Sequence, residues 1–272
     1  MNVRKIDDFK SDIKLAVRIL NKNTEYSYCR NLIDMVFKEN NHHDKKDVYI
    51  RLTVIDSLYS TNMSKRLFGI SDLAEKILAI GDDKKINEEI EKYKKNESSK
   101  INDLLRNTYG IKKDGKEAGH ARSLISKYLY FVTNYKFPIE DSLVKNNLHK
   151  VLKYYGLYEN KEDEVLLKIV KLCNDHSIGF DEFDNFMWLF GKINKGSLSL
   201  ITDKDKCEEI IGIINEEEKS SRDIDEERKS SRDIDKKIAE KLKNEEFINK
   251  CFKDENIKEF LMLSIKIDNE KN

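Results

Sequence analysis

Apolar residues recur every three or four positions along most of the chain, which is the spacing of one buried face of an α-helix. The clearest runs fall at residues 13–20, 32–37, 48–67, 73–80, 124–132, 143–155, 165–173, 180–190 and 247–267. Only one proline interrupts them, and Lys, Glu, Leu and Ile, which all favour helices, are abundant. The pattern predicts an all-α fold, a compact multi-helix globular protein.

Breaks in this pattern predict where helices end. Residues 48–67 read as one helix, after which GISD at 69–72 supplies a glycine stop and a serine start for the next. Residues 83–107 are mostly polar, with a break near ESSK at 97–100. TNYKFP at 133–138 ends a further helix, because the residue before a proline is driven out of the helical region. Pro138 therefore shapes a bend between two helices.

The same reading divides the chain into four consecutive segments. We expect an N-terminal helical segment at 1–47, a helical core at 48–200, a charged linker or exposed helix at 201–245 and a closing C-terminal helix at 246–272. The charged segment carries SSRDID twice, at 220–225 and 230–235, a repeat too short and too polar for a solenoid unit. It predicts a charged C-terminal helical extension to the core.

The net charge of the chain does not indicate a partner, but one basic stretch does. The chain has 51 Lys plus Arg and 51 Asp plus Glu, so its net charge announces neither a nucleic-acid binder nor a binder of acidic ligands. One loop-like stretch, YGIKKDGKEAGHAR at 109–122, nevertheless gathers Lys112, Lys113, Lys116 and Arg122. We interpret this stretch as an exposed basic turn.

Other compositional signals remove whole classes of protein. MNVRKIDDFK lacks the apolar core of a secretory signal, and no apolar run approaches the roughly 18 residues of a membrane helix, so we expect a cytoplasmic protein, a monomer, with no membrane contact. Four scattered cysteines predict buried free thiols rather than disulfides or a metal site. No Walker, HExxH, GxSxG or dinucleotide-binding motif occurs, and we expect no cofactor.

Asp141, three residues after the only proline, is the most specific candidate for chemistry. It stands at or just before the first turn of the helix that the apolar run at 143–155 predicts. An acid at that position is either a helix N-cap or a catalytic carboxylate held at a helix start. The sequence leaves both alternatives open.

The order of helix, basic turn, helix, proline bend, aspartate and helix resembles the helix-hairpin-helix DNA glycosylase superfamily. The resemblance covers roughly residues 48–191, and SLISKYLYF, FPIEDSLV and, more weakly, FDNFMWLFGK carry it, after RLTVIDSLYSTNMSKRLFGISDLAEKI. Where the family has a glycine-rich hairpin, this chain has KKDGKEAGHA. The resemblance implies a base-excision enzyme that acts on double-stranded DNA and cleaves the N-glycosidic bond of a flipped base.

By this correspondence Asp141 falls on the catalytic aspartate, and Ser123 falls where strand-nicking members carry their lysine nucleophile. A serine there implies a monofunctional enzyme. Lys127, one turn further along the same predicted helix, is an alternative amine nucleophile, which we interpret instead as structural or phosphate-facing. A carboxylate suits the reaction, because breaking the glycosidic bond builds positive charge on the sugar.

A flipped base also needs an aromatic pocket, and its flanking phosphates need cations. The candidate pocket residues are Tyr59, His120, Tyr128 and Trp188, and the candidate phosphate contacts are Lys112, Lys113, Lys116 and Arg122. The alternative hypothesis is a non-catalytic helical binding or scaffold protein, in which Asp141 only caps a helix and the basic turn is merely solvated.

Overall fold

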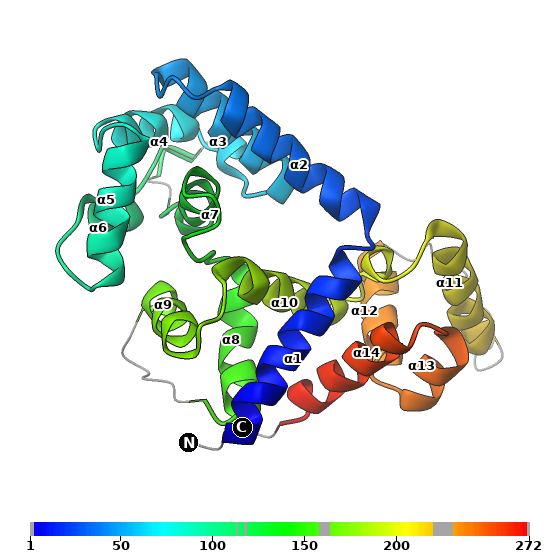
Figure 1. Ribbon diagram of the computed structural model, residues 1–272. Helices are drawn as coiled ribbons and strands as arrows, with labels where there is room; N and C mark the ends of the chain where they lie inside the picture. Colours follow the sequence, from blue (N-terminus) through cyan, green and yellow to red (C-terminus); the bar gives the residue numbers. More distant parts are fainter. Residues whose placement is uncertain (1–2, 113, 117–118, 158–163, 220–230, 271–272) are drawn as a thin grey trace. The chain divides into compact units, whose positions relative to one another are not determined.

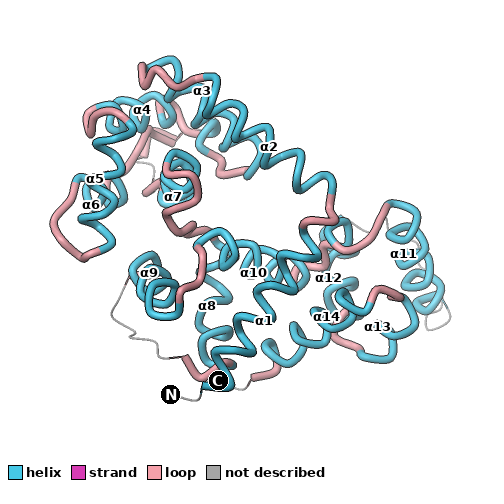
Figure 2. The backbone as a smooth tube through the Cα atoms, in the orientation of Figure 1, coloured by secondary structure: helices cyan, strands magenta, loops and turns pink. Residues whose placement is uncertain are grey.

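A computed structural model describes residues 3–112, 114–116, 119–157, 164–219 and 231–270. Within these residues it contains fourteen α-helices, two short 3₁₀ helices and no β-strand, only two isolated β-bridges (Figures 1 and 2). The predicted all-α fold is confirmed. The α-helices are α1 (Val3–Leu20), α2 (Thr24–Glu39), α3 (Lys45–Tyr59), α4 (Gly69–Leu78), α5 (Asp83–Lys94), α6 (Lys100–Arg106), α7 (Arg122–Val132), α8 (Ser142–Tyr154), α9 (Val165–His176), α10 (Phe180–Ile193), α11 (Lys204–Lys219), α12 (Ser231–Lys241), α13 (Glu245–Cys251) and α14 (Glu255–Asp268).

The chain forms two compact units that interleave along the sequence. Unit 1 consists of Met1–Tyr26, Asn146–Glu159 and Asn185–Asn272, and unit 2 consists of Ser27–Lys145 and Asn160–Asp184. Periodicity along the sequence predicts four consecutive segments instead, since it locates helices but not the tertiary contacts that group them.

Unit 1 is held together by aromatic packing. Phe9 on α1 lies 4.5 Å from Tyr155 and 5.5 Å from Phe186, measured between ring centroids. Phe186 in turn meets Phe260 of α14 at 5.8 Å, and α1 packs against α14. The charged extension joins this unit through α11 and α12. The first SSRDID copy lies outside the described residues, and the second contributes the start of α12.

Unit 2 is built around α7. Every residue from Leu124 to Phe131 is buried, and α7 contacts α3 and α6 (Figure 1). A helix buried on all sides can hold polar groups only if other parts of the protein satisfy them. The polar residues of α7 are therefore where a site is to be sought.

The connection between α3 and α4 differs from the prediction. The helix expected to reach Leu67 ends at Tyr59, because Ser60 adopts a left-handed conformation with φ 50°. The Asp56 carboxylate stabilises the turn that follows, accepting hydrogen bonds from the backbone N–H groups of Met63 and Ser64, both at 2.8 Å. Leu67 instead forms a β-bridge with Ile111.

Two smaller predictions have mixed outcomes. The helix break near ESSK is confirmed, and Ser99 there begins α6 with a capping box that involves Asn102. All four cysteines are free, as expected. The predicted burial is confirmed for Cys173 and Cys251, but Cys207 is only half-buried and Cys29 is exposed.

Candidate functional site

The bend around Pro138 is fastened to α7. Asn134 and Tyr135 reverse the chain with φ of 52° and 67°, and the next residues, 137–140, are buried. The Glu140 N–H donates to the Ser126 Oγ of α7 at 3.0 Å. The predicted bend between two helices is therefore present, and it delivers Asp141 to the start of α8 beside α7.

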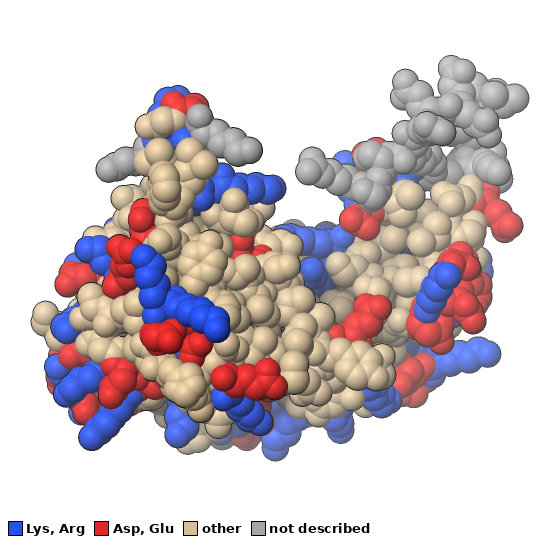
Figure 3. Space-filling model, turned by 90° about the horizontal axis from the view of Figure 1, so that it is seen from above, with Lys and Arg blue, Asp and Glu red and all other residues tan. Residues whose placement is uncertain are grey.

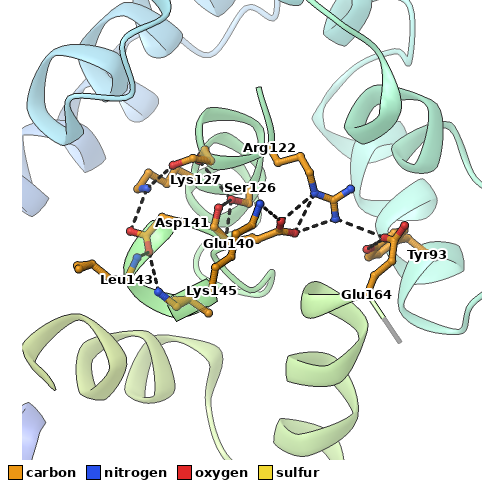
Figure 4. A network of polar contacts seen from close by, with 11 residues as sticks. Tyr93, Arg122, Ser126, Lys127, Glu140, Asp141, Leu143, Lys145 and Glu164 are labelled. Carbon is orange, nitrogen blue, oxygen red and sulfur yellow. Dashed lines mark hydrogen bonds and ion pairs between the residues drawn. The ribbon is translucent and has the colours of Figure 1, made fainter. Parts of the chain in front are cut away.

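Asp141 uses its two carboxylate oxygens differently (Figure 4). Its Oδ1 accepts hydrogen bonds from the N–H groups of Leu143 at 2.9 Å and Val144 at 3.0 Å, which is the geometry of a helix N-cap. Its Oδ2 lies 3.4 Å from the Lys127 Nζ. Asp141 therefore caps α8, and its second oxygen faces a buried cation.

Lys127 connects three of the residues singled out from the sequence. Its side chain is only 3% exposed, and its Nζ donates to the Ser123 Oγ at 2.9 Å. Positions 123 and 127 share one face of α7, because they are four residues apart. The same Nζ lies 5.2 Å from the centroid of the Tyr59 ring. An amine, a carboxylate, a hydroxyl and an aromatic ring thus meet at one place.

Arg122 belongs to a separate cluster. Its Nε and Nη2 donate to the Glu140 carboxylate at 2.8–3.0 Å, and its Nη2 also lies 3.4 Å from Glu164. Lys145 contacts Glu140 at 2.7 Å. Burial raises the pKa of Glu140, but the Arg122 and Lys145 cations lower it by more, so the net pKa falls below the usual value. The guanidinium of Arg122 is thus occupied by carboxylates, which disfavours the phosphate role expected for it.

The other expected pocket residues lie elsewhere. Tyr128 is fully buried, with its ring 5.6 Å from Phe37. His120 is exposed, and its Nδ1 is 3.1 Å from the Asn107 carbonyl. Trp188 belongs to unit 1. Of the four predicted residues, Tyr59 is the one placed against the Lys127 amine.

Asp184 is a further acid that the sequence patterns do not single out. It lies on α10, and Lys127 and Asp141 both act on its carboxyl group electrostatically. Dense packing and the Asp141 carboxylate raise its pKa to about 7 against the opposing effect of Lys127. Its signal in the sequence, an acid inside the aromatic run FDEFDNFMWLF, is a polar residue where burial is expected.

The basic turn is on the surface of unit 2. Lys112 and Lys116 are exposed, and the turn closes with a 2.8 Å bond from the Lys112 N–H to the Lys116 carbonyl. Lys113 lies outside the described residues. Beside the turn, Leu67 is 47% and Phe68 is 70% exposed. Elsewhere cations and anions are interspersed, as on the face shown in Figure 3.

Three further features bear on ligands. A cavity of about 930 Å³ in unit 1, whose lining includes Lys22, Cys207 and Cys251, contains none of the predicted site residues. Among the described residues, no three His, Cys, Asp or Glu side chains gather in an arrangement that could bind a metal ion. No described helix is both long and apolar enough to cross a bilayer.

Comparison with known proteins adds one match. Residues 12–136 match the family model HI_0787_N, described as an N-terminal domain. This stretch is less than half of the chain; it includes Tyr59, Ser123 and Lys127 and ends before Asp141. No curated protein matches the chain. No solved structure matches it either.

Proposed function

We propose that unit 2 binds double-stranded DNA and cleaves the N-glycosidic bond of a flipped base, with Lys127 and Asp141 acting at the sugar. The observation that carries the proposal is the 3.4 Å approach of a buried lysine amine to a carboxylate at a helix start. Both groups lie on structure that is fixed independently, Lys127 on the buried α7 and Asp141 by its N-cap bonds. Preorganised charge of this kind is what transition-state stabilisation requires.

The carboxylate of Asp141 supplies the electrostatic part of the reaction. As the base leaves, positive charge develops on the deoxyribose, and a fixed carboxylate stabilises it. Oδ2 is the available oxygen, because Oδ1 already accepts two backbone hydrogen bonds. Glu140, the neighbouring carboxylate, is bound by Arg122 and Lys145, and so is less suited to this role.

The amine of Lys127 supplies a nucleophile. The resemblance to DNA glycosylases favours attack by water, because it aligns Ser123 with the lysine of strand-nicking members. The geometry supports Lys127 itself, since its Nζ lies beside Asp141 and is oriented by Ser123. In attack by the neutral amine, a C–N bond forms at the sugar carbon while the bond to the base breaks and the base leaves with the electron pair.

Exposed side chains of unit 2 would contact the DNA. Lys112 and Lys116 offer two cations for backbone phosphates, and the exposed Phe68 offers an apolar side chain beside them. Side chains of this kind insert between base steps in many DNA complexes. Such local contacts are compatible with a chain of zero net charge and with the cytoplasmic location expected for it.

The scaffold alternative rests on the N-cap. Oδ1 of Asp141 is fully used in capping α8, which would explain an acid at this position without any reaction. In that account the second oxygen and the buried Lys127 amine form a structural ion pair. A test of covalent chemistry therefore separates the two functions.

The test uses a duplex that contains one abasic site, which presents the sugar aldehyde whatever the natural target base. We expect the wild-type protein to form an imine with this aldehyde, which borohydride reduces to a stable covalent complex visible on a denaturing gel. Lys127→Ala should abolish the complex. Lys136→Ala, at an exposed position in the bend after α7, is the matched control and should leave it intact.

A second arm covers attack by water. Duplexes that carry single damaged or mismatched bases are assayed for base release, with strand breakage read before and after alkali. Release without trapping, with breaks only after alkali, would assign the reaction to water. Neither trapping nor release from any duplex would leave the scaffold hypothesis in place.

A further inference from the structure

Unit 2 contains a second cavity, of about 240 Å³, whose lining comes from α2, α3, α5, α7 and the turn after α7. None of Ser123, Lys127 and Asp141 is among the described residues that line it. At about 30 Å³ per molecule, its volume corresponds to about eight waters. The cavity therefore has the size of a small metabolite.

Aromatic rings form one wall of this cavity. The ring of Phe131 lies 5.7 Å from that of Phe37 and 6.0 Å from that of Tyr135, measured between centroids. The Phe37 ring also lies 4.7 Å from the guanidinium carbon of Arg51. Such a wall favours an apolar group, and the faces of its rings attract cations.

Arg51 lines the cavity and is a buried cation whose hydrogen bonds are incomplete. Its side chain is 1% exposed. Its Nη1 lies 3.3 Å from Asp83 Oδ1 and 3.5 Å from the Tyr128 hydroxyl, and its Nη2 lies 3.2 Å from the Phe37 carbonyl oxygen. These distances are long for a charged donor, whose bonds are usually about 2.7–2.9 Å. Its Nε has no partner among the described residues. An unpaired buried N–H of this kind is typical of a site whose occupant supplies the acceptor.

Two carboxylates on the same cavity each keep one oxygen unused. Asp83 Oδ1 is shared by Arg51 and by the His43 Nδ1, which lies 2.9 Å away, whereas Oδ2 has no partner within the part of the chain that the structure describes. Asp34 Oδ2 accepts the hydroxyl proton of Tyr135, and Oδ1 is likewise left over. The cavity thus offers acceptors as well as donors, and a simple anion would satisfy only the donors.

We propose that this cavity binds a free α-amino acid with a small apolar side chain. Two cations, Arg51 and Lys38, and two carboxylates, Asp34 and Asp83, line the cavity, so their charges balance. A zwitterion preserves this balance and pairs with both signs of charge. The inference does not depend on the function proposed above.

Each part of the ligand has its own partners in this cavity. The α-carboxylate accepts the N–H groups that Arg51 has left over, and the exposed Lys38 adds a second cation at the surface. The α-ammonium binds the unused oxygens of Asp34 and Asp83. The side chain packs on the aromatic wall.

Isothermal titration calorimetry with L-valine, L-leucine and L-phenylalanine tests the proposal on the whole chain. At least one of the three should bind with a dissociation constant below about 1 mM. Its analogues that lack the amine or the carboxylate, which for leucine are 4-methylpentanoate and 3-methylbutylamine, should each bind at least about tenfold more weakly, because each leaves part of the site unpaired.

Two outcomes of the titrations would overturn the proposal. One is the absence of binding by all three amino acids at about 10 mM, which would leave the cavity to ordered water. The other is binding of inorganic phosphate as tight as that of the best amino acid, which would make the cavity a simple anion site.

Substitutions locate the binding in this cavity. Asp34→Asn keeps a side-chain oxygen for the Tyr135 hydroxyl but loses the charge, so it should weaken the amino acid at least about tenfold and spare the analogue without the amine. Lys38→Met, at an exposed position where the fold is not at risk, should weaken both ligands. Asp175→Asn and Lys46→Met, both exposed and outside the cavity, are the matched controls. Wild-type affinity for the amino acid in both Asp34→Asn and Lys38→Met would refute the proposed site.

Discussion

At the residue scale, Asp141 performs two tasks that substitution can separate. Asp141→Asn and Asp141→Ala both remove the ion pair with Lys127, but the Asn side-chain oxygen can still cap α8. The free energy of unfolding should therefore be lower for Ala than for Asn by about 0.5–2 kcal/mol in urea titrations. Base release and the strand breakage that follows it should be lost in both. Full activity of the Asp141→Asn variant would show that Asp141 acts only as a helix N-cap.

The surroundings of Glu140 predict how the stability of the folded protein depends on pH. Its pKa in the folded protein lies below the usual 4.5, because burial, which raises the pKa, is outweighed by Arg122 and Lys145. The stabilisation is therefore fully present above about pH 4.5 and is lost as pH falls through the folded-state pKa. Urea unfolding should show Glu140→Gln less stable than the wild type near neutrality, with the difference shrinking in acid. Glu97→Gln, at an exposed loop position, should show no such convergence.

At the element scale, the join between the α3–α4 connection and the basic turn depends on Gly110. This residue has φ +67°, and a Cβ there would lie 2.5 Å from the Leu67 carbonyl oxygen and 2.7 Å from Gly69. Gly115, in the same turn, has φ +79° but open space around it. Gly115→Ala should cost about 1 kcal/mol for conformation alone.

Gly110→Ala should cost clearly more, because the backbone of two segments must also separate. Thermal unfolding of both variants checks the order. Equal losses of stability in the two variants would show that the backbone segments joined by the bridge between Leu67 and Ile111 separate at no cost in free energy.

At the scale of the whole molecule, zero net charge makes any DNA affinity a local property. The logarithm of the binding constant should fall linearly with the logarithm of salt concentration, and each phosphate that the protein no longer neutralises should flatten the slope by about 0.9. Lys112→Glu with Lys116→Glu should weaken binding at low salt and flatten the slope by about 2. Lys204→Glu, an exposed lysine of unit 1, should leave it unchanged. A slope insensitive to the first pair would place the DNA-binding surface elsewhere.

Local patterns in the sequence were sufficient for the helices and for the bend at Pro138. Helical spacing, capping residues and the conformational limits of proline act within a few residues of each other. The α3–α4 connection escaped this reasoning. The apolar spacing continues to Leu67, but the left-handed Ser60 ends α3 and the Asp56 carboxylate holds the turn that follows.

The sequence by itself determined an all-helical chain and singled out Asp141, Ser123 and Lys127, but it could not say which of them meet. The tertiary structure decided that Lys127 lies against Asp141 and that Tyr59, from another helix, lies over the same amine. It also decided that Arg122 is occupied by Glu140 rather than facing the exposed lysines. The physical reason is that helix periodicity fixes which side chains share a face, whereas the packing of one helix on another fixes which faces meet.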